Sequence, residues 1–113
     1  MDEVETAFNV GEVCIVLNDA DNVAIARRTL TTGMIILFGD ERVTLPSDVP
    51  VGHKLARMSI TAGQPVCRWG FPIGSATTDI QRGEHVHLHN MKSDYIPTFL
   101  AGEFVAGTKD ECR

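Results

Sequence analysis

A seven-residue pattern occurs three times and constrains the fold more than any other feature of the chain. Each copy holds an aliphatic residue, two further residues, a glycine, two more residues and a second aliphatic residue. The copies are Leu30, Gly33 and Ile36; Ile60, Gly63 and Val66; and Ile80, Gly83 and Val86. Glycine adopts a positive φ without steric cost. Each copy therefore predicts a tight corner that is anchored by the first aliphatic residue and followed by a buried strand.

Composition supports one small, strand-rich domain. The chain has 113 residues, of which ten are glycine, five are proline and 43% are hydrophobic. This length and hydrophobic content fit a single core, and the glycines and prolines favour turns over long helices. We expect a mostly-β domain with short helices over residues 1–92. Residues 93–113, interrupted by Pro97, Gly102 and Gly107, are expected to form a tail that docks on its own domain or on a partner.

Local patterns predict the individual elements. Apolar and β-branched runs predict strands over residues 11–17, 34–38, 42–45, 65–69 and 84–90. Apolar residues at spacings of three and four predict a helix over residues 23–30, which Asp21 or Asn22 would cap and Gly33 would follow. Residues 70–74 are expected to form a turn.

Charge and terminal sequence exclude several kinds of partner. The formal net charge of −5 repels phosphate backbones, so no nucleic-acid partner is expected. The acidic N-terminus is not followed by the apolar stretch of a signal peptide. The longest apolar run, residues 34–38, is too short to cross a bilayer. We therefore expect a cytoplasmic protein that does not associate with membranes.

The segment H-V-H-L-H-N at residues 85–90 is the densest group of reactive side chains. On a strand, alternate side chains share one face, so His85, His87 and His89 would stand in a row with neighbours about 6.6 Å apart. Two adjacent imidazoles can bind one metal ion, but all three cannot converge on it. The row indicates a metal site with two ligands from this strand, or acid–base chemistry. The alternative is a solvated polar face of neutral histidines.

Three other positions offer weaker signals. His53 and Lys54 lie in a loop bounded by proline and glycine, where His53 could transfer a proton and Lys54 could bind a carboxylate. The alternative there is an exposed basic loop. A helix cap explains Asp21 and Asn22 fully. A core tryptophan beside a surface arginine is the favoured reading of the pair Arg68-Trp69.

Four segments resemble the altronate dehydratase family in order and spacing. Residues 21–26 read D-N-V-A-I-A and are similar to D-N-V-A-V-A. Residues 49–56 read V-P-V-G-H-K-L-A and resemble I-P-x-G-H-K-x-A. Residues 66–77 read V-C-R-W-G-F-P-I-G-S-A-T and resemble V-x-K-Y-G-x-x-I-G-x-A-T, with Arg68-Trp69 in place of Lys-Tyr. Residues 79–90 are similar to D-I-x-x-G-x-x-V-H-x-H-N.

The resemblance implies a fold and a reaction. It implies the SAF domain of altronate and galactarate dehydratases, which has the β-clip fold. The family removes water from aldonic or aldaric acids to give 2-keto-3-deoxy acids, with Fe²⁺ or a related divalent metal such as Mn²⁺. This chain would be a small subunit, inactive without a large subunit that could hold most of the metal ligands. A sister group, the sulfolactate sulfo-lyases, eliminates sulfite and is split into small and large chains.

The resemblance also assigns roles to residues. It implies catalytic roles for His53, His87 and Asn90, substrate binding by Asp21, Asn22 and Lys54, and metal ligation by His87 and His89. His85 falls on a position that the family motif leaves open. Two alternatives stay open beside the dehydratase subunit: a sulfolactate sulfo-lyase subunit, and a non-catalytic SAF module that caps or assembles a partner. Association of identical chains is a further expectation that the sequence leaves open.

Overall fold

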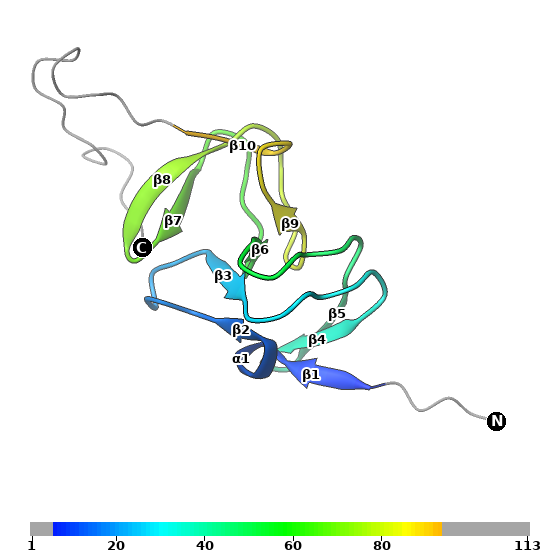
Figure 1. Ribbon diagram of the computed structural model, residues 1–113. Coiled ribbons are helices and arrows are strands. Elements are labelled where there is room, and N and C mark those ends of the chain that lie inside the picture. The colour runs from blue at the N-terminus through cyan, green and yellow to red at the C-terminus, as the bar shows by residue number, and fades with distance from the viewer. Residues whose placement is uncertain (1–5, 94–113) are drawn as a thin grey trace, which may run out of the picture.

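Strands dominate the computed structural model, which describes residues 6–93 (Figure 1). In chain order the elements are β1 (Ala7–Asn9), α1 (Val10–Val13), β2 (Cys14–Ile15), β3 (Val23–Ala26), β4 (Ile35–Phe38), β5 (Glu41–Thr44), β6 (Lys54–Ala56), β7 (Pro65–Arg68), β8 (Phe71–Ala76), β9 (His85–Val86) and β10 (Met91–Lys92). The helix α1 begins where the backbone N–H of Asn9 donates to the Glu12 carboxylate. The predicted mostly-β class with little helix is confirmed.

The strands form three small sheets. The four-stranded sheet has the order β2-β3-β6-β9, and the others have the orders β1-β4-β5 and β10-β8-β7. In Figure 1, β3 and β6 lie between the β7–β8 pair and the β4–β5 pair. β6 pairs antiparallel with both β3 and β9. This brings the loop before β6 next to the segment that follows β9.

The three predicted corners are confirmed. Gly33, Gly63 and Gly83 have φ values of 91°, 90° and 93°. Their backbone N–H groups donate to the carbonyls of Leu45, Ala76 and Ala56, respectively. The aliphatic residues that precede them, Leu30, Ile60 and Ile80, are at most 1% exposed. The repeat therefore builds three equivalent turns, each followed by a strand.

Buried side chains form two clusters rather than one. The first contains nine residues around Leu30, Ile36 and Leu55. The second contains Val23, Ala56, Ile60, Val66, Ala76, Ile80 and Val86. Each cluster holds at least one corner residue, and an isolated antiparallel bridge joins Ile60 to Ile80 within the second. β9 and β7 both contribute to the second cluster, which underlies the candidate site.

The predicted helix over residues 23–30 is wrong. Residues Val23–Ala26 form β3, which pairs with β2 and β6, and Val23, Ala24 and Ala26 are all buried. A central strand covered on both faces has no alternating pattern, so small apolar residues there also fit the spacing of a helix. Asp21 and Asn22 consequently do not cap a helix.

Three element boundaries also differ from the prediction. Residues 11–17 hold part of α1 and the two-residue strand β2 instead of one strand. Of the expected turn at residues 70–74, residues 71–74 lie in β8, because the turn itself is formed by Trp69 and Gly70, both at positive φ. The expected strand over residues 84–90 stops at Val86, and residues 87–90 turn.

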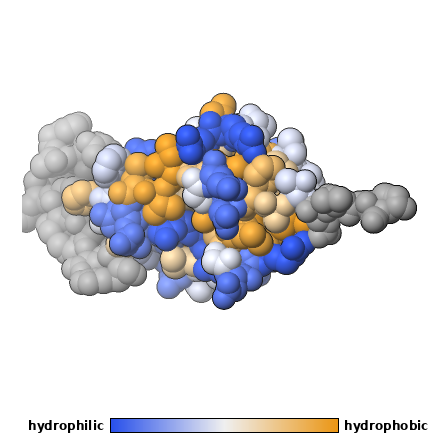
Figure 2. Space-filling view, turned by 90° about the horizontal axis from the view of Figure 1, so that it is seen from below, coloured by the Kyte–Doolittle hydropathy of each residue, from blue (hydrophilic) through white to orange (hydrophobic). Residues whose placement is uncertain are grey.

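Residues 94–113 lie outside the described residues, so the docking tail stays a prediction. Within the described part, no helix is both long and apolar enough to cross a membrane. Several large hydrophobic side chains are exposed there, among them Trp69, Phe71 and Leu88. On the face shown in Figure 2, hydrophobic patches alternate with hydrophilic ones.

Candidate functional site

Three histidines from two distant segments converge at one end of β6 and β9. His53, His85 and His87 each offer a ring nitrogen, and these nitrogens all lie within 4.8 Å of one another. The ring centroids are 4.6 Å apart for His53 and His87, and 5.1 Å apart for His53 and His85. The β6–β9 register explains this, because pairing of Lys54 with Val86 brings His53 opposite His87. We call these three residues the histidine cluster.

Asn90 holds the histidine-bearing segment in shape. Its side-chain carbonyl accepts from the backbone N–H of His87, and its amide donates to the carbonyl of His85, both at 2.9 Å. Asn90 is 4% exposed. Because both ends of its amide bind backbone groups of this segment, the geometry gives Asn90 a positioning role, and its catalytic role stays a prediction. Asn90 also explains why the chain turns after Val86.

His89 lies beside the cluster but is not part of it. Its ring is tilted against that of His85 with centroids 5.4 Å apart. The predicted metal pair was His87 and His89, whereas the structure brings His87 together with His53 and His85. The prediction ranks His85 lower because the family motif leaves its position open. The signal that could have found it is the pairing of its strand with residues 53–55.

The surroundings of His85 and His87 lower the pKa values of these two cluster residues and so favour their neutral forms. Burial, followed by the charges of His87, His53 and His89, lowers the pKa of His85. Desolvation, followed by the charges of His53, His89 and Lys54, lowers the pKa of His87. Nδ1 of His53 and Nε2 of His85 lie 2.9 Å apart, so one of these nitrogens donates to the other. Neutral imidazoles at neutral pH have lone pairs that can accept a proton or bind a metal ion.

The donor set fits a divalent cation. Imidazole nitrogens suit zinc, iron and similar ions of intermediate softness. Metal–nitrogen bonds of roughly 2.0–2.1 Å place two ligands of a tetrahedral ion about 3.3 Å apart. The cluster nitrogens, which lie within 4.8 Å of one another, would have to move closer together to bind one ion. No carboxylate joins the cluster within residues 6–93. Any further ligand would come from outside these described residues.

Lys54 is the basic residue next to the cluster. It lies directly after His53, is half-buried, and its charge contributes to the lowered pKa of His87. Burial, followed by the charge of Arg68, lowers the pKa of Lys54 itself. The predicted position for binding a carboxylate is therefore beside the histidines, with Arg68 as a second cation that sequence reasoning treated as a surface residue.

The side chains of Asp21 and Asn22 bind the backbone of the β7–β8 hairpin and stabilise it. Asp21 is fully buried, and its two carboxylate oxygens accept from the backbone N–H groups of Trp69 at 2.9 Å and Gly70 at 2.7 Å. The Asn22 amide donates to the carbonyl of Pro65 and accepts from the N–H of Cys67. These contacts occupy both side chains, so the geometry does not support their predicted role in substrate binding.

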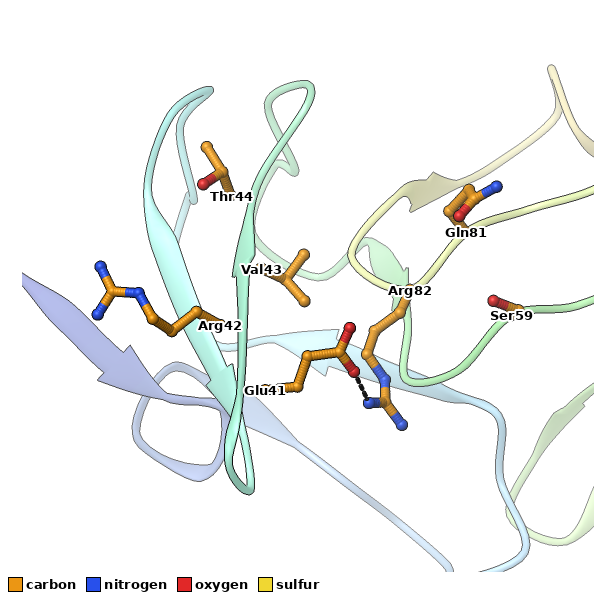
Figure 3. Close-up of a pocket in the computed structure, with 7 residues that line it drawn as sticks. All are labelled: Glu41, Arg42, Val43, Thr44, Ser59, Gln81 and Arg82. Carbon is orange, nitrogen blue, oxygen red and sulfur yellow. Dashed lines mark hydrogen bonds and ion pairs between the residues drawn. The ribbon is translucent and has the colours of Figure 1, made fainter.

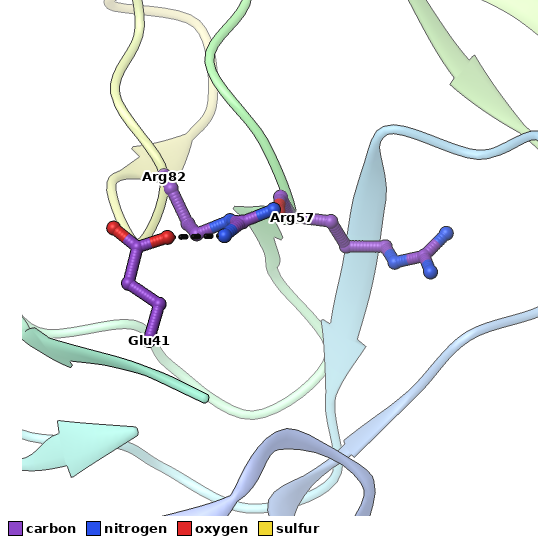
Figure 4. A network of polar contacts seen from close by, with 3 residues as sticks. All are labelled: Glu41, Arg57 and Arg82. Carbon is purple, nitrogen blue, oxygen red and sulfur yellow. Dashed lines mark hydrogen bonds and ion pairs between the residues drawn. The ribbon is translucent and has the colours of Figure 1, made fainter. Parts of the chain in front are cut away.

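Another opening lies between β5 and the third corner. Seven residues line this pocket, including Glu41, Gln81 and Arg82 (Figure 3). Arg82 forms an ion pair with Glu41 and also donates to the carbonyl of Arg57 (Figure 4). Its positive charge is therefore already neutralised, which makes this pocket a weaker anion site than the surface around Lys54.

Sequence comparison identifies the family. The sequence profile of the altronate/galactarate dehydratase SAF domain matches residues 12–94. The chain belongs to this family. The match spans β2 to β10 and includes every residue of the histidine cluster, so the resemblance seen in the four motifs is confirmed.

Curated relatives carry this domain in two contexts. Altronate dehydratases of Escherichia coli (strain K12) and Bacillus subtilis (strain 168) are 41% and 36% identical over 80 residues. That match covers 71% of this chain and 16% of each relative. The (2R)-sulfolactate sulfo-lyase subunit alpha of Chromohalobacter salexigens is 32% identical over 89 residues, which cover 69% of this chain and 92% of that subunit. The SAF domain thus occurs both within long dehydratases and as most of a short lyase subunit.

Proposed function

We propose that this chain is the small subunit of an altronate-type sugar-acid dehydratase. In this role it adds the histidine cluster and Lys54 to an active site that a large subunit completes. The observation that carries the proposal is the convergence of His53, His85 and His87 beside Lys54, in a domain of the altronate/galactarate dehydratase family. The reaction is the loss of water from an aldonic or aldaric acid to give a 2-keto-3-deoxy acid.

The site residues match what this elimination requires. A base must remove the proton on the carbon next to the carboxylate, and an acid must protonate the departing hydroxide. A neutral imidazole can do the first and a protonated imidazole the second, and the lowered pKa values of His85 and His87 favour the neutral form. In the proposed arrangement His53 and His87 transfer protons, while the Lys54 ammonium binds the carboxylate.

Metal binding is a second use of the same side chains. His53, His85 and His87 would hold a divalent ion such as Fe²⁺ or Mn²⁺. When bound, such an ion would act as a Lewis acid toward the substrate oxygens. Imidazoles that ligate an ion cannot carry protons at the same time, so proton transfer would then fall to the large subunit. Titration of the purified chain with Mn²⁺ distinguishes the two uses.

A sulfolactate sulfo-lyase subunit is the second candidate. The observation that favours it is the match to 92% of the sulfo-lyase subunit alpha from Chromohalobacter salexigens. The required groups are the same, except that sulfite leaves instead of hydroxide. A third candidate, a SAF module without catalytic groups, predicts that histidine substitutions change assembly or KM but not kcat.

One experiment tests all three candidates. The chain is co-purified with the large subunit from its native source and assayed on altronate, galactarate and sulfolactate with Fe²⁺ or Mn²⁺. The dehydratase proposal expects a 2-keto-3-deoxy acid only when both chains are present. Sulfite release would favour the sulfo-lyase. Full turnover by the large subunit alone would contradict both lyase assignments for this chain.

A further inference from the structure

Two basic side chains next to the histidine cluster lack acidic partners. Within residues 6–93, neither Lys54 nor Arg68 forms an ion pair. Nε of Arg68 is buried and has no hydrogen-bond partner in that part of the chain. Arg82, by contrast, is neutralised by Glu41 (Figure 4). The unpaired guanidinium is unusual because buried donors are almost always satisfied.

Register and strand alternation place both side chains beside the same buried cluster. Lys54 pairs with Val86 on β9, so the two side chains lie on the same face of the sheet. On β7, Arg68 shares a face with Val66, two residues earlier. Val66 and Val86 belong to the same buried cluster. Both basic residues therefore lie next to members of one buried cluster. The charge of Arg68 contributes to the lowered pKa of Lys54, and the charge of Lys54 contributes to the lowered pKa of His87.

Such an arrangement is stabilised by an anion. Two like charges that are partly removed from water repel one another, and an unsatisfied buried donor adds a desolvation cost. A bound carboxylate offsets the repulsion, and the planar guanidinium matches its two oxygens. We propose that Lys54 and Arg68 together form a binding site for the carboxylate of a small hydroxy acid. A carboxylate held there would place the adjacent carbons of the acid next to the histidine cluster.

The hairpin turn gives this site a defined geometry. Arg68 directly precedes Trp69, whose φ is +61°. A positive φ is costly for a tryptophan, and the buried Asp21 carboxylate holds it by accepting from Trp69 and Gly70. By holding this turn, Asp21 fixes the backbone position of the neighbouring Arg68. The identity of the acid rests on the proposed function, whereas the binding of a carboxylate does not.

Trp69 provides a probe for this site. It is the single tryptophan of the chain, it is 58% exposed, and it is adjacent to Arg68. We would titrate the full chain with gluconate at constant ionic strength, without metal. Binding would be followed by Trp69 fluorescence and by the NMR shifts of backbone amides in β6 and β7. The expected result is saturable binding of gluconate, no binding of the uncharged polyol xylitol, and weaker binding of sulfate.

Substitutions then assign the binding to these residues. Arg68→Gln and Lys54→Gln are each expected to weaken gluconate binding at least about tenfold, and Arg68→Lys to weaken it less. Arg27→Gln removes the same charge at an exposed position outside this surface and is expected to change nothing. Circular dichroism checks that each variant folds, and the two glutamine variants test the site independently.

The outcomes separate this inference from the proposed function. Gluconate binding that is unchanged in folded Arg68→Gln and Lys54→Gln would overturn the inference, even if the two-chain complex proves to be a dehydratase. Sulfate binding tighter than gluconate binding would overturn the assignment to a carboxylate. Loss of gluconate binding in both glutamine variants would sustain the inference, even if no substrate of the panel turns over.

Discussion

The Asp21–Asn22 segment and the histidine cluster differ in what they leave available to a ligand. Both belong to motifs that resemble the same family. The side chains of Asp21 and Asn22 form hydrogen bonds with the backbone of residues 65–70, at distances of 2.7–2.9 Å. The cluster histidines contact mainly one another and are half-buried or exposed. The Asp21–Asn22 motif therefore stabilises the fold, whereas the histidine motifs place reactive side chains at the surface.

The difference teaches that a family motif mixes two kinds of residue. A buried, fully paired carboxylate such as that of Asp21 stabilises one backbone conformation. Partly exposed imidazoles with lowered pKa values, such as those of His85 and His87, are available for proton transfer or metal binding. Substitutions in the first group should change the free energy of unfolding, and substitutions in the second should change activity.

The largest expected effect on stability comes from Asp21→Asn. The new amide NH₂ would face the N–H groups of Trp69 and Gly70, and we expect the free energy of unfolding to fall by roughly 2–4 kcal/mol. Urea denaturation measures it. Asp19→Asn, an exposed neighbour, serves as the control. A variant with unchanged stability but lost activity would move Asp21 from the fold-building group to the site.

The second effect concerns His87→Ala. We expect turnover of the two-chain complex to fall at least about 100-fold, and the free energy of unfolding to change by less than about 0.5 kcal/mol because the side chain is exposed. Binding of Mn²⁺ by the chain should weaken by about 10- to 100-fold if the cluster ligates metal. His89→Ala is the matched control. An equal loss in both variants would show that the convergence of three histidines has no special role.

A third test uses two asparagines with the same hydrogen-bond pattern. Asn22 bridges Pro65 and Cys67, and Asn90 bridges His85 and His87. We expect Asn22→Ala and Asn90→Ala to lower the free energy of unfolding by a similar amount, about 1–2 kcal/mol. Only Asn90→Ala should also weaken Mn²⁺ binding, since only Asn90 positions cluster residues. Weaker Mn²⁺ binding in Asn22→Ala would contradict the distinction between residues that stabilise the fold and residues that position the site.

The smallest expected effect is a pH dependence of folding stability that arises from Asp48 at the first corner. Asp48 accepts from the backbone N–H and the hydroxyl of Thr32, and these hydrogen bonds lower its pKa. A carboxylate whose pKa is lower in the folded state adds stability above its unfolded pKa, near 3.9, and loses it as pH falls through the folded value. The urea midpoint of Asp48→Asn should therefore lie below wild type at pH 7 and approach it near pH 3. A constant difference across this range would show that Asp48 acts without its charge.

The sequence predicts local features of the fold better than distant ones. The three glycine corners were correct because a positive φ is a property of a few consecutive residues. β3 was predicted as a helix because V-A-I-A-R-R-T-L fits either period. Its strand conformation depends on pairing with β2 and β6, and β6 begins 28 residues after Ala26.

The same reason limits prediction of the site. His53, His87 and Lys54 were chosen as functional, and the structure brings them together. The family motif leaves the position of His85 open and therefore ranks it below His89. The register between β6 and β9, which brings His53 opposite His87, cannot be read from the row of histidines alone. The contacts of Asp21 were missed for an equivalent reason, since the amides that it accepts from lie 48 and 49 residues away.

The two asparagine bridges have a consequence for how this domain avoids self-association. Among residues 6–93, β7 and β9 are each the last strand of their sheet, and open strand edges are templates for pairing with other chains. The Asn22 amide binds two backbone groups on β7, and the Asn90 amide binds one on β9 and one directly after it, where another chain's strand could otherwise pair. A single side chain thus closes an edge where a larger protein would need a further strand. Loss of either amide would expose a site for aggregation before it exposes the core.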